Sequence, residues 1–366
     1  MAGKLYAWGD NERLSLGTGE SGAVLSPVQV GSETWAKIAP GDSSTLGIKA
    51  DGTLWGWGGN DYGILGLGDT ADRATPVQIG SDTWRSAAVG LTLAAGIKTD
   101  GTLWAWGRNN AGQLGAFATG DQYAPVQLGT DLWLDVAVRS GHLLAIREDG
   151  AMFAGGNNTY KQLGTGYSTY VYRDFPTLVA GGHHWKKVVT GPFNSVGITA
   201  NGDLYAWGSA SSYVNGVSPS VEFHSPNQIV TGLQWRDIAV GDEHACAVAT
   251  DGSLWVWGKA STYALGTSEF VDIKAPVHRE FGLPISSLGL EKFASLIVTE
   301  GGAVYGAGIT KYAATGMPGY TTPLLTEVPD IVATDVFAKS RNAFVIVGAP
   351  GPINFWTNFV GQTESL

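Results

Sequence analysis

Residues 35–58 read WAKIAPGDSSTLGIKADGTLWGWG, and residues 84–107 read WRSAAVGLTLAAGIKTDGTLWAWG. Both stretches open on a tryptophan, continue through short apolar runs to an Asp-Gly pair, and close on Leu-Trp-x-Trp-Gly. Further copies of the unit begin at Trp133, Trp185 and Trp235, with weaker ones at Ile285 and Thr334. Self-similarity at a fixed period is the signature of a repeat architecture, so this unit decides the fold.

A two-residue turn is the most regular mark of the unit. Asp-Gly and Asn-Gly supply the positive φ angles that a type I′ hairpin needs. Such pairs begin at residues 51, 100, 149, 201 and 251, and Gly-Gly and Pro-Gly follow at 301 and 350. The steps between successive pairs are therefore 49, 49, 52, 50, 50 and 49 residues. Each repeat is predicted to contain a β-hairpin at the same place.

Each repeat predicts four strands. In the copy that begins at Trp35 they lie at 37–39, 45–49, 54–58 and 76–79, each bounded by glycine or proline. No window of about 11 residues carries a helical apolar stripe. Four antiparallel strands repeated seven times predict an all-β fold, a seven-bladed β-propeller of four-stranded blades. The third-strand tryptophans, such as Trp57, are expected to fill the space between blades.

The two ends of the chain are expected to share one blade. The strands left over from complete repeats are 5–9 and 27–30 at the start, and 335–338 and 343–347 at the end. N-terminal strands pairing with C-terminal strands would close the ring and remove its sheet edges. Residues 1–348 are therefore predicted to form one propeller domain. Residues 349–366 are predicted to be a C-terminal tail, because their strand-like run competes with residues 5–9 for one place.

Composition excludes several classes of partner. The net charge is −10, and the few lysines and arginines are scattered, whereas nucleic-acid binders show a basic face or tail. No apolar run reaches the roughly 20 residues of a membrane helix, and no signal peptide is expected at the N-terminus. A single cysteine, Cys246, excludes an internal disulfide, which fits a cytosolic protein and equally a virion or surface protein with a large core. Nucleic acid and membrane insertion are not expected.

No motif in the sequence indicates catalysis, a cofactor or a metal. The Gly-x-Gly-x-x-Gly match that begins at Gly17 imitates a dinucleotide fingerprint, but no helix pattern follows it. His142 and His244 share one repeat position, just before the second strand, where a structural hydrogen bond is expected. His244 and Cys246 point to the same face, but a zinc site needs three or four ligands. The protein is therefore expected not to be an enzyme and to carry no cofactor and no metal.

Tyrosines in the loops between third and fourth strands are the candidate binding residues. These loops vary most, and the longest spans 157–175 and also holds Tyr172. The candidates on this loop face are Tyr62, Tyr160, Tyr167, Tyr170, Tyr213, Tyr263 and Tyr312. They either lean on their blades or form aromatic anchors for a protein or a glycan. In the tail, the candidate contacts to a partner or a neighbouring subunit are Phe355, Trp356 and Phe359.

The repeat resembles that of the regulator of chromosome condensation family. The matching motifs are D-G-x-L-W-x-W-G, N-x-x-x-x-L-G and P-V-Q, at residues 51–58, 60–66 and 76–78, and again at 100–107, 110–115 and 125–127. The match is specific in the first three repeats and fades later, where Gly155 and Ala307 stand in the place of Trp57. The resemblance implies a seven-bladed propeller, in agreement with the count of repeats.

The resemblance implies several functions, because members of this family differ. One is a chromatin-bound exchange factor for a small GTPase, a secreted bacterial relative inhibits β-lactamases, and many bacterial and bacteriophage copies resemble surface or virion proteins. This chain lacks the basic tail of the chromatin member, and its Trp-rich, Lys-poor repeats resemble the bacterial and bacteriophage group. We therefore expect a non-catalytic protein-binding or structural module, either virion-associated (decoration or tail) or at a bacterial surface. The alternatives are a secreted enzyme inhibitor and a small-GTPase exchange factor or scaffold.

Overall fold

The structure is a computed structural model, and its regular elements are almost all β-strands. It describes residues 2–115, 118, 120–167, 172–217, 222–260, 263–267, 270–309, 322–339 and 341–348. Within these ranges helical structure is limited to a short 3₁₀ turn, η1 (Asp61–Gly63), and a 3₁₀ residue at Gly115. The all-β prediction is confirmed. The predicted tail, residues 349–366, lies outside the described residues and stays a prediction.

The largest sheet has 13 strands in the spatial order β11-β10-β9-β8-β7-β6-β5-β4-β3-β2-β1-β25-β24. Its strands are β1 (Gly3–Gly9), β2 (Val24–Pro40), β3 (Ser44–Lys49), β4 (Thr53–Gly58), β5 (Arg73–Val89), β6 (Leu93–Lys98), β7 (Thr102–Gly107), β8 (Gln122–Arg139), β9 (His142–Arg147), β10 (Met152–Gly156), β11 (Arg173–Leu178), β24 (Asp335–Lys339) and β25 (Asn342–Val347). All of its neighbouring strands for which a register is given run antiparallel.

Three further sheets have four strands each. They are formed by β12 (Trp185–Thr190), β13 (Asn194–Thr199), β14 (Leu204–Gly208) and β15 (Phe223–Val230); by β16 (Trp235–Val240), β17 (His244–Ala249), β18 (Leu254–Gly258) and β19 (Ile273–Arg279); and by β20 (Ile285–Leu290), β21 (Ala294–Thr299), β22 (Ala303–Gly308) and β23 (Thr322–Val332). These sheets show the four-stranded unit that the repeat predicts.

The 13-stranded sheet is the same unit joined through long strands. β5 is 17 residues long, and it pairs with β4 through Gln78 opposite Trp55 and with β6 through Trp84 opposite Lys98. It is therefore the fourth strand of one repeat and the first strand of the next. Gly80 lies between these two parts with a φ of 61°, a left-handed conformation that glycine adopts without steric cost. β2 and β8 are built in the same way, which the sequence did not predict.

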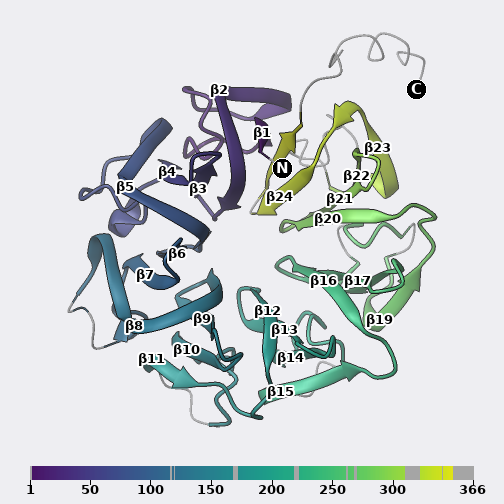
Figure 1. Ribbon diagram of the computed structural model, residues 1–366. Coiled ribbons are helices and arrows are strands. Elements are labelled where there is room, and N and C mark those ends of the chain that lie inside the picture. Colours follow the sequence, from purple (N-terminus) through teal and green to yellow (C-terminus); the bar gives the residue numbers. More distant parts are fainter. Residues whose placement is uncertain are drawn as a thin grey trace.

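Strands from near both ends of the chain lie in one sheet. β1 pairs on one side with β2 and on the other with β25, with Leu5 opposite Ile346 and Trp8 opposite Ala343. In Figure 1 the N-terminus accordingly lies beside β24. Residues 5–9 and 343–347 are thus neighbours, as the leftover strands predict.

The four-stranded units stand side by side around a central axis, with first strands inside and fourth strands outside (Figure 1). A cavity of about 560 Å³ lies on this axis. It is lined by the first strand of each repeat, namely β2, β5, β8, β12, β16, β20 and β24. This is a propeller arrangement, in which each sheet buries its faces against its neighbours.

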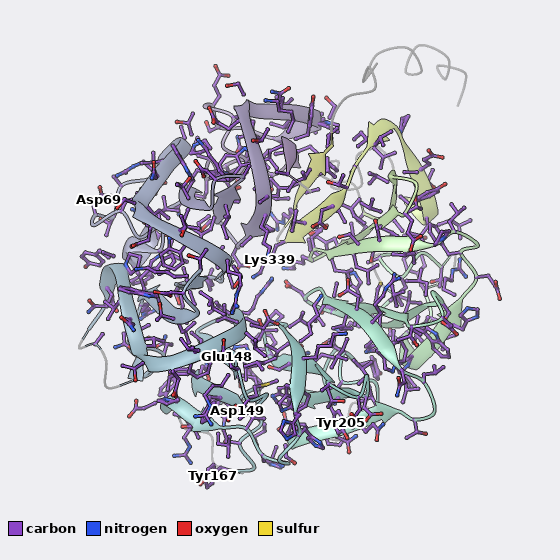
Figure 2. The ribbon with its side chains drawn as sticks, viewed as in Figure 1. Asp69, Glu148, Asp149, Tyr167, Tyr205 and Lys339 are labelled. Atoms are coloured by element: carbon purple, nitrogen blue, oxygen red, sulfur yellow. The ribbon has the colours of Figure 1, made fainter. Side chains whose placement is uncertain are left out.

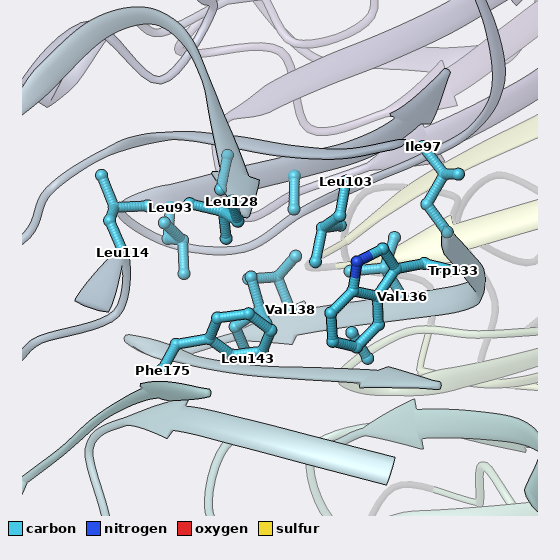
Figure 3. Packing of buried hydrophobic residues seen from close by; sticks show 13 residues of the cluster. Leu93, Ile97, Leu103, Leu114, Leu128, Trp133, Val136, Val138, Leu143 and Phe175 are labelled. Atoms are coloured by element: carbon cyan, nitrogen blue, oxygen red, sulfur yellow. The ribbon is translucent and has the colours of Figure 1, made fainter. Parts of the chain in front are cut away.

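The hydrophobic core lies between neighbouring units. Trp57 and Trp106 are fully buried, and each donates its indole N–H to a carbonyl in the preceding repeat, at Ser15 (2.9 Å) and Ile64 (2.7 Å). Trp207 and Trp257 do the same. Figure 3 shows one such cluster, in which side chains from β6 and β7 interdigitate with those of β8 and β9. The expected role of the third-strand tryptophans is confirmed.

Where the third repeat lacks its tryptophan, another aromatic side chain takes the space. Gly155 stands at that position, and a Cβ placed on it would lie 2.5 Å from the Cβ of Phe175. Phe175 comes from the fourth strand, β11, and is buried against Leu114 and Trp133. The substitution of tryptophan by glycine is therefore compensated within the same sheet.

Candidate protein-binding face

The propeller has two faces of different construction. We call the side with the first-to-second and third-to-fourth strand connections the loop face, and the side with the Asp-Gly turns the turn face. Exposed large apolar residues of the loop face are Tyr62, Leu91, Tyr160, Tyr167, Tyr172, Phe193, Phe270 and Val271. Those of the turn face are Leu132, Leu134, Leu283 and Val332. The loop face therefore offers more apolar surface to a partner.

Three of the predicted tyrosines are exposed and held by neighbours. The guanidinium of Arg108, from the next repeat, lies 4.7 Å from the ring centre of Tyr62. The ring of Tyr160 is 4.6 Å from that of Phe193, which also belongs to the next repeat. Tyr167 lies 4.6 Å from the guanidinium of Arg173, and Figure 2 places it at the outer edge of the ring. These rings are exposed but positioned, which lowers the entropy cost of binding.

Tyr213 and Tyr263 differ from the other three. Both are half-buried, and their φ angles of 60° and 56° are close to the 59° of Tyr62. Their N–H groups donate to the carbonyls of Ala210 and Ala260, the same bond that Gly63 makes to Asn60. They therefore shape their loops and contribute less surface. The remaining predicted contacts, Tyr170, Tyr312, Phe355, Trp356 and Phe359, lie outside the described residues.

Asparagine side chains hold the loops in shape. Asn60 accepts a hydrogen bond from the N–H of Leu65 at 2.9 Å and donates to the carbonyl of Asp69 at 2.9 Å. Asn11 and Asn109 make the same pair of bonds. In the loop after β7, the asparagine that makes these bonds is therefore Asn109. The sequence motif had been matched to Asn110, one residue later. A side chain that replaces several backbone bonds fixes a loop before any ligand arrives.

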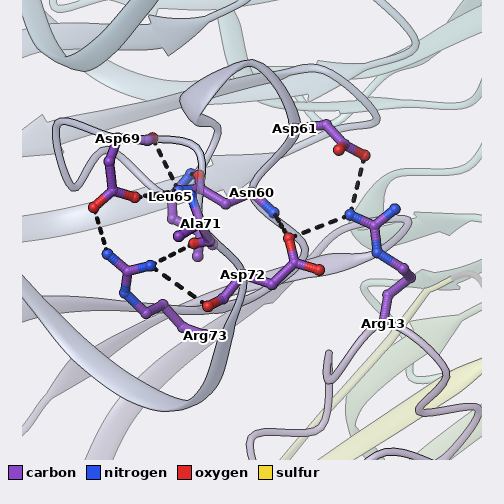
Figure 4. Close-up of polar contacts among 8 residues, drawn as sticks. All are labelled: Arg13, Asn60, Asp61, Leu65, Asp69, Ala71, Asp72 and Arg73. Carbon is purple, nitrogen blue, oxygen red and sulfur yellow. Dashed lines mark hydrogen bonds and ion pairs between the residues drawn. The ribbon is translucent and has the colours of Figure 1, made fainter.

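Ion pairs join neighbouring loops on this face. Arg13, in the loop after β1, reaches Asp61 (3.2 Å) and Asp72 (3.4 Å) in the loop after β4. Within that second loop Arg73 pairs with Asp69 at 2.6 Å (Figure 4). Because these groups are largely exposed, each pair adds little stability, about 0–1 kcal/mol. Their effect is to set the relative position of adjacent loops.

Leu91 and Phe193 are exposed residues of this face that the sequence reasoning missed. Both lie in first-to-second strand loops, beside the central axis. Leu91 occupies the place of Asp42 and Asp242 in other repeats, and Phe193 that of Glu243. An apolar residue at a polar loop position is visible once the repeats are aligned, so the signal was present in the sequence.

The buried histidines and the cysteine are structural. His244 Nε2 lies 3.0 Å from Ser295 Oγ, and His142 Nε2 lies 3.5 Å from Ser195 Oγ, so each joins two neighbouring repeats. Burial lowers the pKa of His142 to about 3 and that of His244 to about 4, so both are neutral near pH 7. Burial raises the pKa of the Cys246 thiol to about 12, which leaves it unreactive.

The described part of the chain shows no group of three or more His, Cys, Asp or Glu side chains placed to hold a metal ion. No helix among the described residues is long and apolar enough to span a membrane.

Comparison with known families settles the class of this propeller. Residues 1–289 match the family model of the RCC1-like domain. The chain belongs to this family. No curated protein sequence matches this RCC1-like domain, but several solved structures share its fold. At identities of 18–20%, that likeness speaks for the fold alone.

Two of the structures similar to this RCC1-like domain are of the same yeast protein. Prp20p from Saccharomyces cerevisiae, described with its binding to Gsp1p and histones, is 20% identical with a TM-score of 0.82, over 96% of this chain and 92% of that one. Yeast RCC1 (Prp20) bound to Kap60 is 20% identical with a TM-score of 0.84, over 95% and 90%. Human WBSCR16 is 18% identical with a TM-score of 0.83, over 95% and 100%.

Proposed function

We propose that this RCC1-like domain is a non-catalytic protein-binding module that uses its loop face. The observation that carries the proposal is the set of exposed aromatic and aliphatic side chains on that face, held in place by neighbouring repeats. Aromatic residues on a rigid frame are the usual anchors of protein interfaces. The buried, neutral histidines and the unreactive cysteine support a binding role over a catalytic one.

We also propose the finer form of the fold, a closed ring of seven blades. The pairing of β1 with β25 supports it, since one sheet then contains strands from both ends of the chain. β20 packs against β24, so the sheet that holds both ends contacts the last four-stranded sheet. The seven first strands around the central cavity support the same arrangement.

Paired variants test the binding role of the loop face. Tyr62→Ala with Tyr167→Ala removes two exposed rings from this face, and Leu132→Ala with Leu283→Ala removes similar surface from the turn face. In affinity purification from the native source, we expect wild type and the turn-face variant to retain the same partner and the loop-face variant to lose it. Melting temperatures should stay equal. Equal retention by both variants, or melting of the loop-face variant, would overturn the proposal.

A small-GTPase exchange factor or scaffold is the second candidate. It is favoured by the likeness to Prp20p, which is described as binding Gsp1p. The test is the release of fluorescent GDP from purified Gsp1p in the presence of this protein. Release accelerated above the spontaneous rate, and lost in the loop-face variant, would support exchange activity. Binding without acceleration would leave a scaffold, and no binding would reject both.

A place in a virion or at a bacterial surface remains a separate proposal, drawn from the style of the repeats. The matched structures give it no support, and the same is true of an inhibitor role and of a glycan ligand. Fractionation of the source organism, with antibody detection in particle, surface and cytosolic fractions, tests the location directly.

A further inference from the structure

We propose that the closed end of the central cavity binds the carboxylate of a small organic acid through Arg139 and Lys339. This inference concerns a different part of the molecule from the loop-face residues, so each proposal can be rejected without rejecting the other. The site lies on the axis, where Figure 2 shows Lys339 at the centre of the ring.

The two ends of the cavity differ in exposure, and we call the end at Arg139, whose side chain is the more buried, the closed end. At the turn-face end its lining includes Lys187 and Asp237, whose side chains are 37% and 25% exposed. At the loop-face end it includes Arg139, whose side chain is only 5% exposed. The volume, about 560 Å³, falls within the roughly 300–1,000 Å³ of small-molecule sites. A small solute that enters from the turn face would meet Arg139 at the closed end.

Three long charged side chains form the closed end. At the end of the first strand, four repeats carry glycine, at Gly41, Gly90, Gly191 and Gly241. The other three repeats carry Arg139, Glu291 and Lys339 at this position, as the pairing of Arg139 with His142 and of Lys339 with Asn342 shows. Glycine has no side chain, so the long ones have room to reach across the axis.

The reach across the axis is visible in the contacts. The guanidinium of Arg139 pairs with Asp42 at 3.4 Å and also with Asp242, two residues from other repeats. The Lys339 ammonium donates to the carbonyl of Val89 at 2.8 Å, from the first strand of another repeat. These contacts hold both cations in fixed positions.

A ligand in the cavity meets the two cations before it meets their counter-charges. Arg139 and Lys339 line the cavity, whereas Asp42, Asp242 and Glu291 do not. Arg139 Nε is buried and has no hydrogen-bond partner among the described residues. Among the groups that line the cavity at this end are therefore two cations and an unmet donor, which a carboxylate would satisfy.

The electrostatics of Lys339 agree with this assignment. Burial and then the nearby charge of Arg139 lower the pKa of Lys339 to about 7, while Asp42 and Asp242 act in the opposite direction. The neighbouring His142 is neutral. A bound anion would stabilise the ammonium form of Lys339.

The acidic residues at the turn-face end of the cavity lie too far from the closed end to repel such a ligand strongly. Asp237 is paired with Lys187, and Asp335 accepts a hydrogen bond from Ser287. Four strand residues separate this level from the closed end, a distance of about 13 Å. Asp135, which also lines the cavity four residues before Arg139, accepts hydrogen bonds from the N–H groups of Val136 at 3.0 Å and Val188 at 3.2 Å.

Calorimetric titration with succinate tests the site, and succinamide serves as the uncharged probe of the same shape. At about pH 6, where Lys339 is protonated, we expect one succinate per chain and no binding of succinamide. Lys339→Met should weaken succinate binding at least about tenfold, since it removes a charge-assisted hydrogen bond. Lys49→Met is the matched control, because it removes an outer lysine that pairs with Glu33, and it should bind as wild type does.

Circular dichroism first establishes that both variants fold. If Lys339→Met does not fold, the comparison of succinate with succinamide on wild type still decides. Equal binding of the two probes, equal affinity in Lys339→Met, or no binding of succinate would overturn the proposal and leave ordered water as the content of the cavity. The result of the partner-binding experiment with the loop-face variant does not affect this test, because that variant leaves the cavity unchanged.

Discussion

At the scale of single residues, the core shows how the loss of one large side chain is compensated by a neighbouring side chain that fills the same space. Gly155 and Phe175 touch the same space that tryptophan fills in neighbouring repeats. Close-packed interiors transmit such changes to direct neighbours and little further. The third repeat therefore keeps a filled core although its sequence lacks the third-strand tryptophan.

A double-mutant cycle tests this compensation. Gly155→Ala alone should lower the free energy of unfolding by about 1–3 kcal/mol, because the new methyl group clashes with Phe175. Phe175→Ala alone should cost about 3–5 kcal/mol through the cavity it leaves. The double variant should be more stable than the sum of the two effects predicts, measured by urea unfolding. Strict additivity would show that the two residues do not share this space.

Glu291 makes stability depend on pH. Burial raises its pKa from 4.5 to about 7, while the N–H of Arg341 donates to its Oε2 at 2.8 Å. Between about pH 4.5 and 7 the folded protein binds more protons than the unfolded chain at this site, so stability falls as pH rises. Glu291→Gln keeps the acceptor and removes the titration. Between pH 5 and pH 7.5, wild type should lose roughly 1–3 kcal/mol more than the variant in urea unfolding. Parallel losses would contradict the assignment.

At the scale of elements, the turn pairs and strand runs were sufficient to predict the four-stranded unit and its order. The fusion of strands in β2, β5 and β8 was not predictable, because the fourth strand of one repeat and the first of the next read as two apolar runs with polar residues between them. A glycine such as Gly80 lets the backbone turn without breaking the ladder.

The candidate site was predictable in part. Exposed Tyr62, Tyr160 and Tyr167 were found from loop position and residue type. Tyr213 and Tyr263 were grouped with them, although they are half-buried and occupy the loop position of Gly63, one residue after that of Tyr62. The charges of the closed cavity end were not foreseen, since Arg139 and Lys339 meet only where the first strands surround the central cavity.

The outer fourth strands leave one edge unpaired, and all of them carry proline. These prolines are Pro27, Pro76, Pro125, Pro176, Pro226, Pro276 and Pro323. Proline lacks the N–H that another strand would need, so it blocks edge-to-edge pairing. We expect Pro76→Val with Pro125→Val to increase aggregation, measured by light scattering at constant melting temperature. A matched Gln78→Val with Gln127→Val variant controls for added hydrophobicity, and equal aggregation of the two would contradict this role.

At the scale of the whole molecule, we expect the sheet in which β1 pairs with β25 to govern cooperativity. β1 lies between β2 and β25, so its removal breaks contacts on both sides. Deletion of residues 2–9 should lower the unfolding free energy by far more than the loss of one peripheral strand and should expose the core, measured by urea unfolding and dye binding. A circular permutant that joins residue 348 to residue 2 and opens in the turn at Asp149-Gly150 should fold. A deletion variant with near wild-type stability would show that the ring does not depend on this strand.

The position of β1 also has a consequence for biosynthesis. β1 is synthesised long before its partner β25, which begins at Asn342, and stays without that partner until then. Throughout translation the nascent chain therefore presents an unpaired strand edge, which is a target for chaperones and proteases. A ribosome that stalls before β25 is made releases a product in which β1 lacks one of its two partner strands, so faulty synthesis of β25 is detected through β1.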